Sequence, residues 1–396
     1  MTTIAEALQA VEAAQPVRVP TPKHPKGWEP GHEWDGTQGT ITTPPRAERP
    51  TTWDRYIRES GLDPADVEVI EPVQVRGWQN YDGVWLHYFR LTLRKRHGDG
   101  MPDLQALLKS ARASRAKTKT PPETVESAMV VCWADPQVGK VARRGGTPEL
   151  IARVAEYQAK IDALAKAWKC DAAYLLDLGD SIEGFESGGG PMAQAVTNDL
   201  SLMDQVDVAA TLEFELLRTL AQTHSRVVLA GVGSNHCRWR AGKTNLGNPG
   251  DDWGIFVLKQ IHRRIQDMPE KFGHVSVTWP DTHEETLSLD IAGTIVGLTH
   301  GHQAGRADKI PDWWAKQVHG GQPTAHADLL IYGHFHHLNI KPSGMNPHTG
   351  KAKWAIGAPT CDNGSDWYRM TSGADSDPNL LVFRVTKNGW DRLTLL

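Results

Sequence analysis

The sequence predicts a layered α/β domain over about residues 126–396, preceded by a small α+β appendage. Three observations support this fold class. Predicted strands and helices alternate from residue 126 onward. Five of the predicted strands run directly into Asp, Asn, Gln or His beside a glycine. The length of 396 residues also exceeds the roughly 100–200 residues of a typical single domain, so a second part is expected.

The composition indicates a soluble globular chain. It is 39% hydrophobic and 23% charged, which excludes wholesale disorder. Its four cysteines are far apart and form no C-x-x-C pair, so neither a zinc ribbon nor a disulfide framework is expected. No apolar run approaches the roughly 18–20 residues of a membrane span, and the first residues do not resemble a secretory leader. We therefore expect a cytoplasmic protein with reduced thiols and no membrane partner.

The net charge of -4 conceals three unlike segments. Residues 1–89 carry a net charge of -5, residues 90–119 carry +7, and residues 120–396 carry -6. The middle segment overlaps residues 98–125, which we interpret as a basic linker that acts as a tether or a phosphate-contacting arm. A solvated linker without a partner remains the alternative.

The region before this linker has two parts. Residues 1–50 are rich in proline, with eight prolines in residues 16–50, and should be largely flexible. Residues 51–97 form a small α+β module. Its helix is expected from Thr52 to Ser60, and its two strands at 73–78 and 84–93 alternate around a turn.

This module carries the candidate nucleic-acid contacts. Basic residues that could reach phosphates are Arg90, Arg94, Lys95 and Arg96. Aromatic residues that could stack on bases are Trp78, Tyr81, Trp85, Tyr88 and Phe89. The alternative is that these aromatics form the core of the module, an interpretation favoured for Trp85 and Phe89.

Capping residues and apolar spacing place the elements of the α/β domain. A helix begins at Thr147-Pro148-Glu149, which supply an N-cap, a proline at the first helical position and an acid in the first turn. The expected strands are at 128–133, 172–176, 227–232, 275–279, 286–291, 294–299, 328–332, 352–357, 380–386 and 391–396, with helices at 147–168 and 198–222. Alternation of this kind places ligand sites at the carboxyl ends of strands.

Polar side chains gather at those strand ends. They are Asp135 and Gln137 after the first strand, Asp180 and Glu183 after the second, Asn235 and His236 after the third, then His300 and His302, and finally His334 and His336. One such ending would mean little by itself, because Asp135 could be a turn residue and Asn235 a helix cap. Five in one domain predict a metal site.

The donor atoms indicate which metal. Carboxylate and amide oxygens mixed with imidazole nitrogens, without thiolates, suit Mn, Fe or Zn better than Ca. Six or seven ligands are too many for one tetrahedral zinc, whereas two ions about 3.5–4 Å apart would use them all. We therefore expect two divalent transition metal ions, with Mn favoured and Fe or Zn as alternatives.

The order Asp-x-Gln, Gly-Asp-x-x-Glu, Asn-His, His-Gly-His and Gly-His-x-His resembles the calcineurin-like metallophosphoesterase superfamily over about residues 126–396. The resemblance implies a four-layer α/β/β/α sandwich with a dinuclear site. It further implies that Asp135, Gln137, Asp180 and His336 hold the first metal, and that Asp180, Asn235, His300 and His334 hold the second. His236 would face the scissile phosphate as a general acid or stabiliser of the transition state.

The sequence departs from the family pattern at three positions. Gln137 stands where His is usual, Glu183 replaces the commoner Asp, and Cys237 replaces a carboxylate after the Asn-His pair. We interpret Cys237 as structural and not as a nucleophile. Glu183, His302 and Arg238 are expected to surround the ligands, and the glycine-rich residues 188–191 to form a mobile loop beside the site.

The implied reaction is hydrolysis of a phosphoester by a metal-activated water, without a covalent intermediate. The appendage and its basic residues favour a phosphodiesterase or nuclease that acts on DNA, similar to repair-nuclease and bacteriophage-encoded members of the superfamily. A phosphatase or phosphodiesterase for small nucleotides is the alternative, consistent with the acidic bulk of the α/β domain. A nucleic-acid-binding protein with a degenerate phosphoesterase domain is a third, supported by Gln137 and Cys237.

Overall fold

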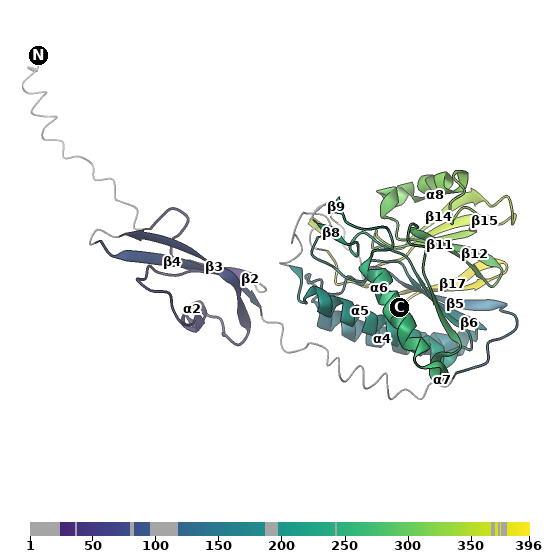
Figure 1. Ribbon diagram of the computed structural model, residues 1–396, viewed down its shortest axis with the longest axis horizontal. Helices are drawn as coiled ribbons and strands as arrows, with labels where there is room; N and C mark the ends of the chain where they lie inside the picture. The colour runs from purple at the N-terminus through teal and green to yellow at the C-terminus, as the bar shows by residue number, and fades with distance from the viewer. Residues whose placement is uncertain are drawn as a thin grey trace, which may run out of the picture. The chain divides into compact units, whose positions relative to one another are not determined.

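The computed structural model divides into two compact units, residues 1–100 and residues 101–396 (Figure 1). It describes residues 24–35, 38–79, 83–95, 118–186, 197–241, 244–365, 369–370, 373 and 378–396. The expected mobile loop at 188–191 and most of the basic linker therefore lie outside the described residues. In the part of the chain that is described, no helix combines the length and apolar character that a membrane crossing requires.

In its described residues, the first unit is a four-stranded antiparallel sheet with one short helix. Its elements are β1 (Gly31–Trp34), β2 (Gln38–Thr42), α2 (Asp54–Glu59), β3 (Val67–Gln79) and β4 (Trp85–Lys95), and the strand order is β1-β2-β4-β3. Tyr56 and Ile57 of α2 pack against Phe89, Leu91 and Leu93 of β4. Burial of these side chains holds the helix on one face of the sheet.

This unit begins earlier in the chain than we expected. Residues 1–50 were expected to be largely flexible, yet Gly31–Trp34 and Gln38–Thr42 form strands. The β2 strand pairs with β4 along its whole length, and Ile41 is buried in the shared core. The prolines flank this hairpin without interrupting it, so the ladder hydrogen bonds form. The helix also starts at Asp54 rather than at Thr52.

The second unit contains a six-stranded and a five-stranded sheet. The strands of the larger sheet are β5 (Ser127–Trp133), β6 (Ala172–Asp177), β7 (Val227–Gly231), β10 (Val275–Thr278), β16 (Leu381–Thr386) and β17 (Gly389–Leu395), in the order β10-β7-β6-β5-β16-β17. Strands β10, β7, β6 and β5 are parallel, whereas β16 and β17 are antiparallel to their neighbours. The carboxyl ends of β5, β6 and β7 therefore lie at one edge.

The smaller sheet repeats this arrangement. It consists of β11 (Thr286–Ile291), β12 (Thr294–Thr299), β13 (Leu329–Tyr332), β14 (Asn339–Met345) and β15 (Ala352–Gly357), in the order β11-β12-β13-β15-β14. Strands β12, β13 and β15 are parallel. A separate two-stranded hairpin consists of β8 (Arg240–Ala241) and β9 (Thr244–Asn245).

Helices cover the outer face of each sheet (Figure 1). The helices on the larger sheet are α4 (Thr147–Trp168), α5 (Leu202–Thr223) and α6 (Trp253–Gln266), with the short α7 (Pro269–Phe272) after them. On the smaller sheet, Ile310 and Trp314 of α8 (Ile310–His319) pack against Leu330 and Tyr332. The alternation of strands and helices predicted α4 and α5, but α6 and α8 were not predicted.

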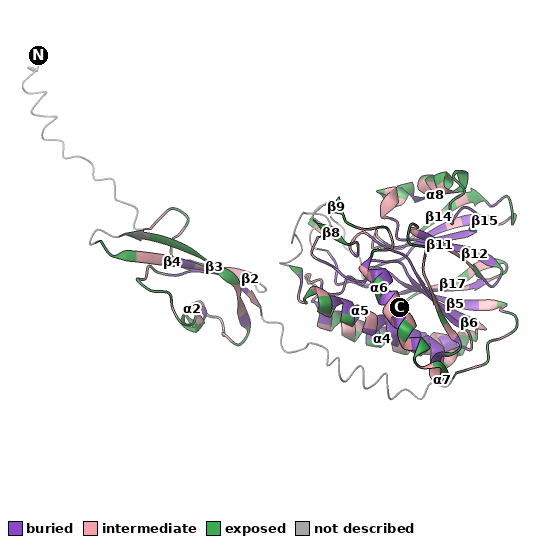
Figure 2. Ribbon diagram, in the orientation of Figure 1, coloured by how far each residue is buried: buried purple, intermediate pink, exposed green. Residues whose placement is uncertain are grey.

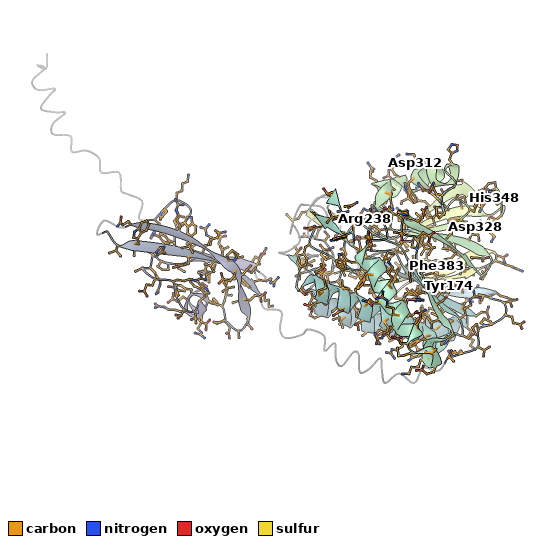
Figure 3. The ribbon with its side chains drawn as sticks, viewed as in Figure 1. Tyr174, Arg238, Asp312, Asp328, His348 and Phe383 are labelled. Atoms are coloured by element: carbon orange, nitrogen blue, oxygen red, sulfur yellow. The ribbon has the colours of Figure 1, made fainter. Side chains whose placement is uncertain are left out.

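The two sheets pack against each other through a second apolar cluster. Along β5 the side chains alternate, so that Met129 and Val131 face the helices while Val130 contacts the cluster between the sheets. Tyr174 and Phe383, both labelled in Figure 3, belong to this inner cluster. Burial on both faces explains the nearly continuous apolar runs of the sequence, and Figure 2 shows these strands as buried.

Candidate metal centre

The five polar strand endings of the sequence meet at one place. Asp135, Asp180 and Asn235 follow β5, β6 and β7 of the larger sheet, and His300 and His334 follow β12 and β13 of the smaller sheet. Hydrogen bonds connect the loops of the two sheets: the backbone N–H of His334 donates to both carboxylate oxygens of Asp135, at 3.0 and 2.9 Å. The site therefore spans the interface between the sheets.

The backbone at the site adopts an uncommon conformation. Among the described residues, eight that are not glycine have a positive φ, and five of these are expected site residues: Asp135, Gln137, Asp180, His334 and His336. Their φ angles lie between 42° and 69°, in the left-handed region that costs about 1 kcal/mol or more per residue. Such a concentration shows that the loops are held in place by their surroundings.

One glycine in these loops is required by a close approach. A Cβ atom at Gly333 would lie 2.5 Å from Oδ2 of Asp135, which is closer than any real contact. A side chain at this position would push β13 and its loop away from β5. The glycine of the Gly-His-x-His motif therefore allows the two sheets to bring their ligands together.

Three side chains place potential ligand atoms within 4.8 Å of one another: Asp180, His300 and His334. Oδ2 of Asp180 lies 3.2 Å from Nε2 of His300, and Oδ1 of Asn235 lies 2.8 Å from the same nitrogen. We call these four residues the Asp180 group. Nδ1 of His300 donates to the carbonyl of Leu178 at 2.7 Å. This hydrogen bond fixes the ring and directs Nε2 toward the oxygens of Asp180 and Asn235.

The donor set of the Asp180 group fits a divalent transition metal ion. It combines one carboxylate, one amide oxygen and two imidazoles without a thiolate. His300 and Asp180 are buried, while His334 is partly accessible, so the group lies next to the surface of the protein on the side of His334.

Electrostatics within the Asp180 group agree with this assignment. Burial would lower the pKa of His300, but the adjacent Asp180 carboxylate outweighs it and raises the pKa to about 9. Burial, together with the charge on His300, lowers the pKa of His334 to about 4. Against its own burial, the pKa of Asp180 is held well below its usual value by His300 and His236. A cation would replace the proton that His300 holds between two oxygens.

His236 lies between this group and Gln137. Its backbone N–H donates to Oδ1 of Asp180 at 2.9 Å, and its Nδ1 donates to the carbonyl of Glu183 at 2.9 Å. Nε2 lies 3.3 Å from the amide nitrogen of Gln137. Burial opposes protonation of His236, but Asp180 and Glu183 outweigh it and raise its pKa.

The remaining expected ligands are Asp135, Gln137 and His336, and they contact two residues that the sequence did not indicate. Nζ of Lys140 donates to Oε1 of Gln137 at 2.5 Å and to Oδ2 of Asp362 at 2.6 Å. His336 lies between two carboxylates, with Nε2 3.4 Å from Asp135 and Nδ1 3.4 Å from Asp362. We call these five residues the Lys140 group.

The Lys140 group balances its own charges. Burial alone would lower the pKa of His336, but Asp362 and Asp135 outweigh it and raise the pKa to about 10. In spite of burial, the ammonium of Lys140 and the ring of His336 hold the pKa of Asp362 far below its usual range. Two carboxylates therefore face two cationic side chains.

The surrounding residues that we expected from the sequence also lie nearby. Oε2 of Glu183 is 3.3 Å from Nδ1 of His236. Arg238, labelled in Figure 3, forms an ion pair with Glu285, a residue that we did not predict. Nε2 of His302 lies 3.9 Å from the same Glu285, and burial together with the charge on His300 lowers the pKa of His302 to about 3.

Two buried carboxylates that the sequence did not indicate hold the loops. Asp252, the N-cap of α6, accepts from the backbone N–H groups of Ser234 at 3.0 Å and Ile255 at 3.1 Å. Asp177 accepts from the backbone N–H of Gly179 at 2.9 Å. Burial raises the pKa of Asp177 to about 7 and that of Asp252 to about 6.

Of the candidate nucleic-acid contacts in the first unit, some are already engaged. Arg94 pairs with Glu68, and the guanidinium of Arg90 stacks on Trp28 at 4.5 Å while also donating to the backbone. Lys95 is exposed, and Arg96 lies outside the described residues.

The aromatic residues of this unit include both buried and exposed side chains. Tyr88 and Phe89 are buried and cannot stack on a base. Trp85, which we expected in the core, is instead 59% exposed, because it lies at the start of β4, beyond the part of the sheet that α2 covers.

Comparisons with known proteins add little to this geometry. No protein-family model matches the chain, and no curated protein matches its sequence. Among solved structures, a conserved uncharacterized protein from Streptococcus pneumoniae TIGR4, described as a predicted phosphoesterase, aligns with 68% of this chain and 98% of that chain. The identity is 11% and the TM-score 0.24, so the functional argument rests on the residues of the site.

Proposed function

We propose that this chain is a metal-dependent phosphoester hydrolase of the calcineurin-like type, with its two sheets and covering helices forming the four-layer α/β/β/α sandwich of that superfamily. The observation that carries the proposal is the convergence of Asp180, His300 and His334 within 4.8 Å, beside Asn235 and His236. Mn is the ion that we favour, with Fe or Zn as alternatives.

The residues of the site have different roles in the proposed reaction. A divalent cation held by the Asp180 group would supply an activated water and positive charge for the phosphoryl oxygens. The carbonyl of Leu178 accepts from Nδ1 of His300 and so fixes the tautomer of that ring. The positive φ angles of Asp180 and His334 fix the direction of their side chains. His236, anchored at Nδ1 by the Glu183 carbonyl, directs Nε2 toward the site, where it can donate a hydrogen bond to a phosphoryl or leaving-group oxygen.

We propose a phosphodiester of DNA as the substrate. The exposed indole of Trp85 and the exposed Lys95 offer a stacking surface and a cation on the first unit. Base stacking on an aromatic ring contributes about 1–3 kcal/mol per base and tolerates any sequence. Residues that are buried or paired, such as Tyr88 and Arg94, are excluded from this role.

The test is a substrate panel with protein that has been stripped by a chelator and reloaded with Mn, Fe or Zn. The panel contains a small phosphomonoester, a small phosphodiester, and single- and double-stranded DNA. We expect metal-dependent cleavage of the diester and of DNA. Trp85→Ala should weaken DNA cleavage about tenfold and leave the small diester unchanged.

Each other outcome selects a different function. Activity on monoesters or small nucleotides alone would replace the DNA proposal with a nucleotide phosphatase or phosphodiesterase. Binding of DNA without metal-dependent cleavage would indicate a degenerate phosphoesterase domain. Equal loss of both diester and DNA cleavage in Trp85→Ala would remove the stacking role.

A further inference from the structure

Lys140 carries a positive charge into the part of the site where the family pattern would require a second metal ion. Its side chain is 11% exposed, and its Nζ lies 2.5 Å from Oε1 of Gln137 and 2.6 Å from Oδ2 of the fully buried Asp362. Lys140 lies seven residues after the end of β5, so its amine reaches the same loops as the expected ligands.

The ammonium occupies the coordination side of Gln137. Oε1 is the one atom of this amide that can bind a cation, and it already accepts from Lys140. A metal ion bonded to Oε1 at about 2.2 Å would lie within about 4.7 Å of the ammonium nitrogen. A divalent ion and an ammonium at this separation repel each other strongly in a buried site.

The other ligands of this half contact groups other than the ammonium. Asp135 accepts the backbone N–H of His334 with both oxygens, and the two ring nitrogens of His336 each face a carboxylate. In the described part of the chain, the Asp180 group supplies the one cluster of three or more acidic, histidine or cysteine side chains whose ligand atoms converge.

We propose that the ammonium of Lys140 takes the place of one of the two metal ions, so that the site holds a single divalent cation in the Asp180 group. Lys140 then provides a fixed positive charge on the side of Gln137 and Asp362, at the position where a second ion would otherwise face the phosphoryl group. This inference rests on the proposed function in assigning the Asp180 group to a metal.

The first test counts ions in the full-length protein. Stripped protein is reloaded with excess Mn, freed of unbound metal, and measured by elemental analysis and electron paramagnetic resonance. We expect one ion per chain and the signal of an isolated Mn. Two ions per chain with an exchange-coupled signal would overturn the role of Lys140, whereas the absence of bound metal would overturn the proposed function itself.

The second test removes the charge. Lys140→Gln should raise the count from one ion to two, because the ligands of the Lys140 group become available and the repulsion disappears. Lys166→Gln, on the exposed face of α4, is the matched control and should retain one ion. A count of one in Lys140→Gln would contradict the proposal. If that variant does not fold, the ion count and the resonance signal of the unmodified protein decide alone.

Discussion

The Asp180 group and the Lys140 group contain the same kinds of side chain but satisfy them differently. Each has an aspartate, an amide and a histidine of the Gly-His-x-His motif. In the Asp180 group these donors converge on one point, with His300 as the fourth member. In the Lys140 group, the ammonium of Lys140 bonds to Gln137 and to a second aspartate, Asp362, which also faces His336. If Lys140 replaces one ion as proposed, residue types at strand ends do not by themselves determine how many cations a site holds, because one nearby ammonium can satisfy the same oxygens.

The largest difference is expected between the two aspartates. Asp180→Asn removes a carboxylate whose oxygens face His236 and His300, and should lower metal affinity at least about 1,000-fold and abolish hydrolysis. Asp135→Asn should change metal affinity by less than about tenfold. Isothermal titration with Mn measures both. Similar losses in the two variants would show that both groups hold metal.

His236 separates metal binding from turnover. Its side chain faces the site but is not a member of the Asp180 group, so His236→Ala should lower kcat about 100-fold or more while the metal content stays unchanged. Elemental analysis and the small-diester assay give the two readouts. Loss of the metal together with activity would make His236 a ligand instead.

The two amides provide a matched pair with a smaller effect. Asn235→Ala removes an oxygen that lies 2.8 Å from Nε2 of His300, and should weaken Mn binding about 10- to 100-fold. Gln137→Ala removes an amide that already bonds Lys140, and should weaken it by less than about threefold. Titration of both variants under identical conditions tests the contrast. A larger loss in Gln137→Ala than in Asn235→Ala would reverse the assignment of the two groups.

The smallest expected effect concerns protonation in metal-free protein. The pKa of His334 is lowered to about 4, whereas that of His336 is raised to about 10. Protonation of His336 therefore stabilises the folded state, and this contribution is complete below about pH 6.5 and is lost as the pH rises toward 10. Protonation of His334 has the opposite effect, because this residue binds a proton more readily in the unfolded chain. Its effect lowers the stability of the fold as the pH drops from 6.5 to 4. Histidine NMR should find His334 neutral at pH 6 and His336 protonated at pH 8. Coincident titrations would contradict the contrast.

Local patterns predicted most strands and the meeting of their ends. The strands expected at 286–291 and 294–299 have these bounds in the structure, because the first alternates between polar and apolar residues and the second is a short apolar run between two threonines. The helix expected at 147–168 is α4, since its proline and acidic first turn mark the start, but its N-cap is Gly146 and not Thr147 as expected. These signals are short-range and remain visible in one sequence.

Other features depend on distant contacts. Lys140 and Asp362 are separated by 222 residues, so no local pattern links them. Asp362 could have been suspected, because it follows β15 just as the predicted ligands follow their strands. The exposure of Trp85 depends on where α2 ends on the sheet, and the strands β1 and β2 depend on pairing with β4. Tertiary contacts override composition in each case.

The position of the Asp180 group across the two sheets has a mechanical consequence. Asp180 and Asn235 belong to loops of the larger sheet, and His300 and His334 belong to loops of the smaller one. A bound cation would therefore act as a further cross-link between two sheets that already meet through apolar side chains and a few hydrogen bonds between their loops. Removal of the metal should loosen this joint as well as the chemistry. At a hundredfold excess over its dissociation constant, a ligand of the folded state adds about 2.7 kcal/mol of stability.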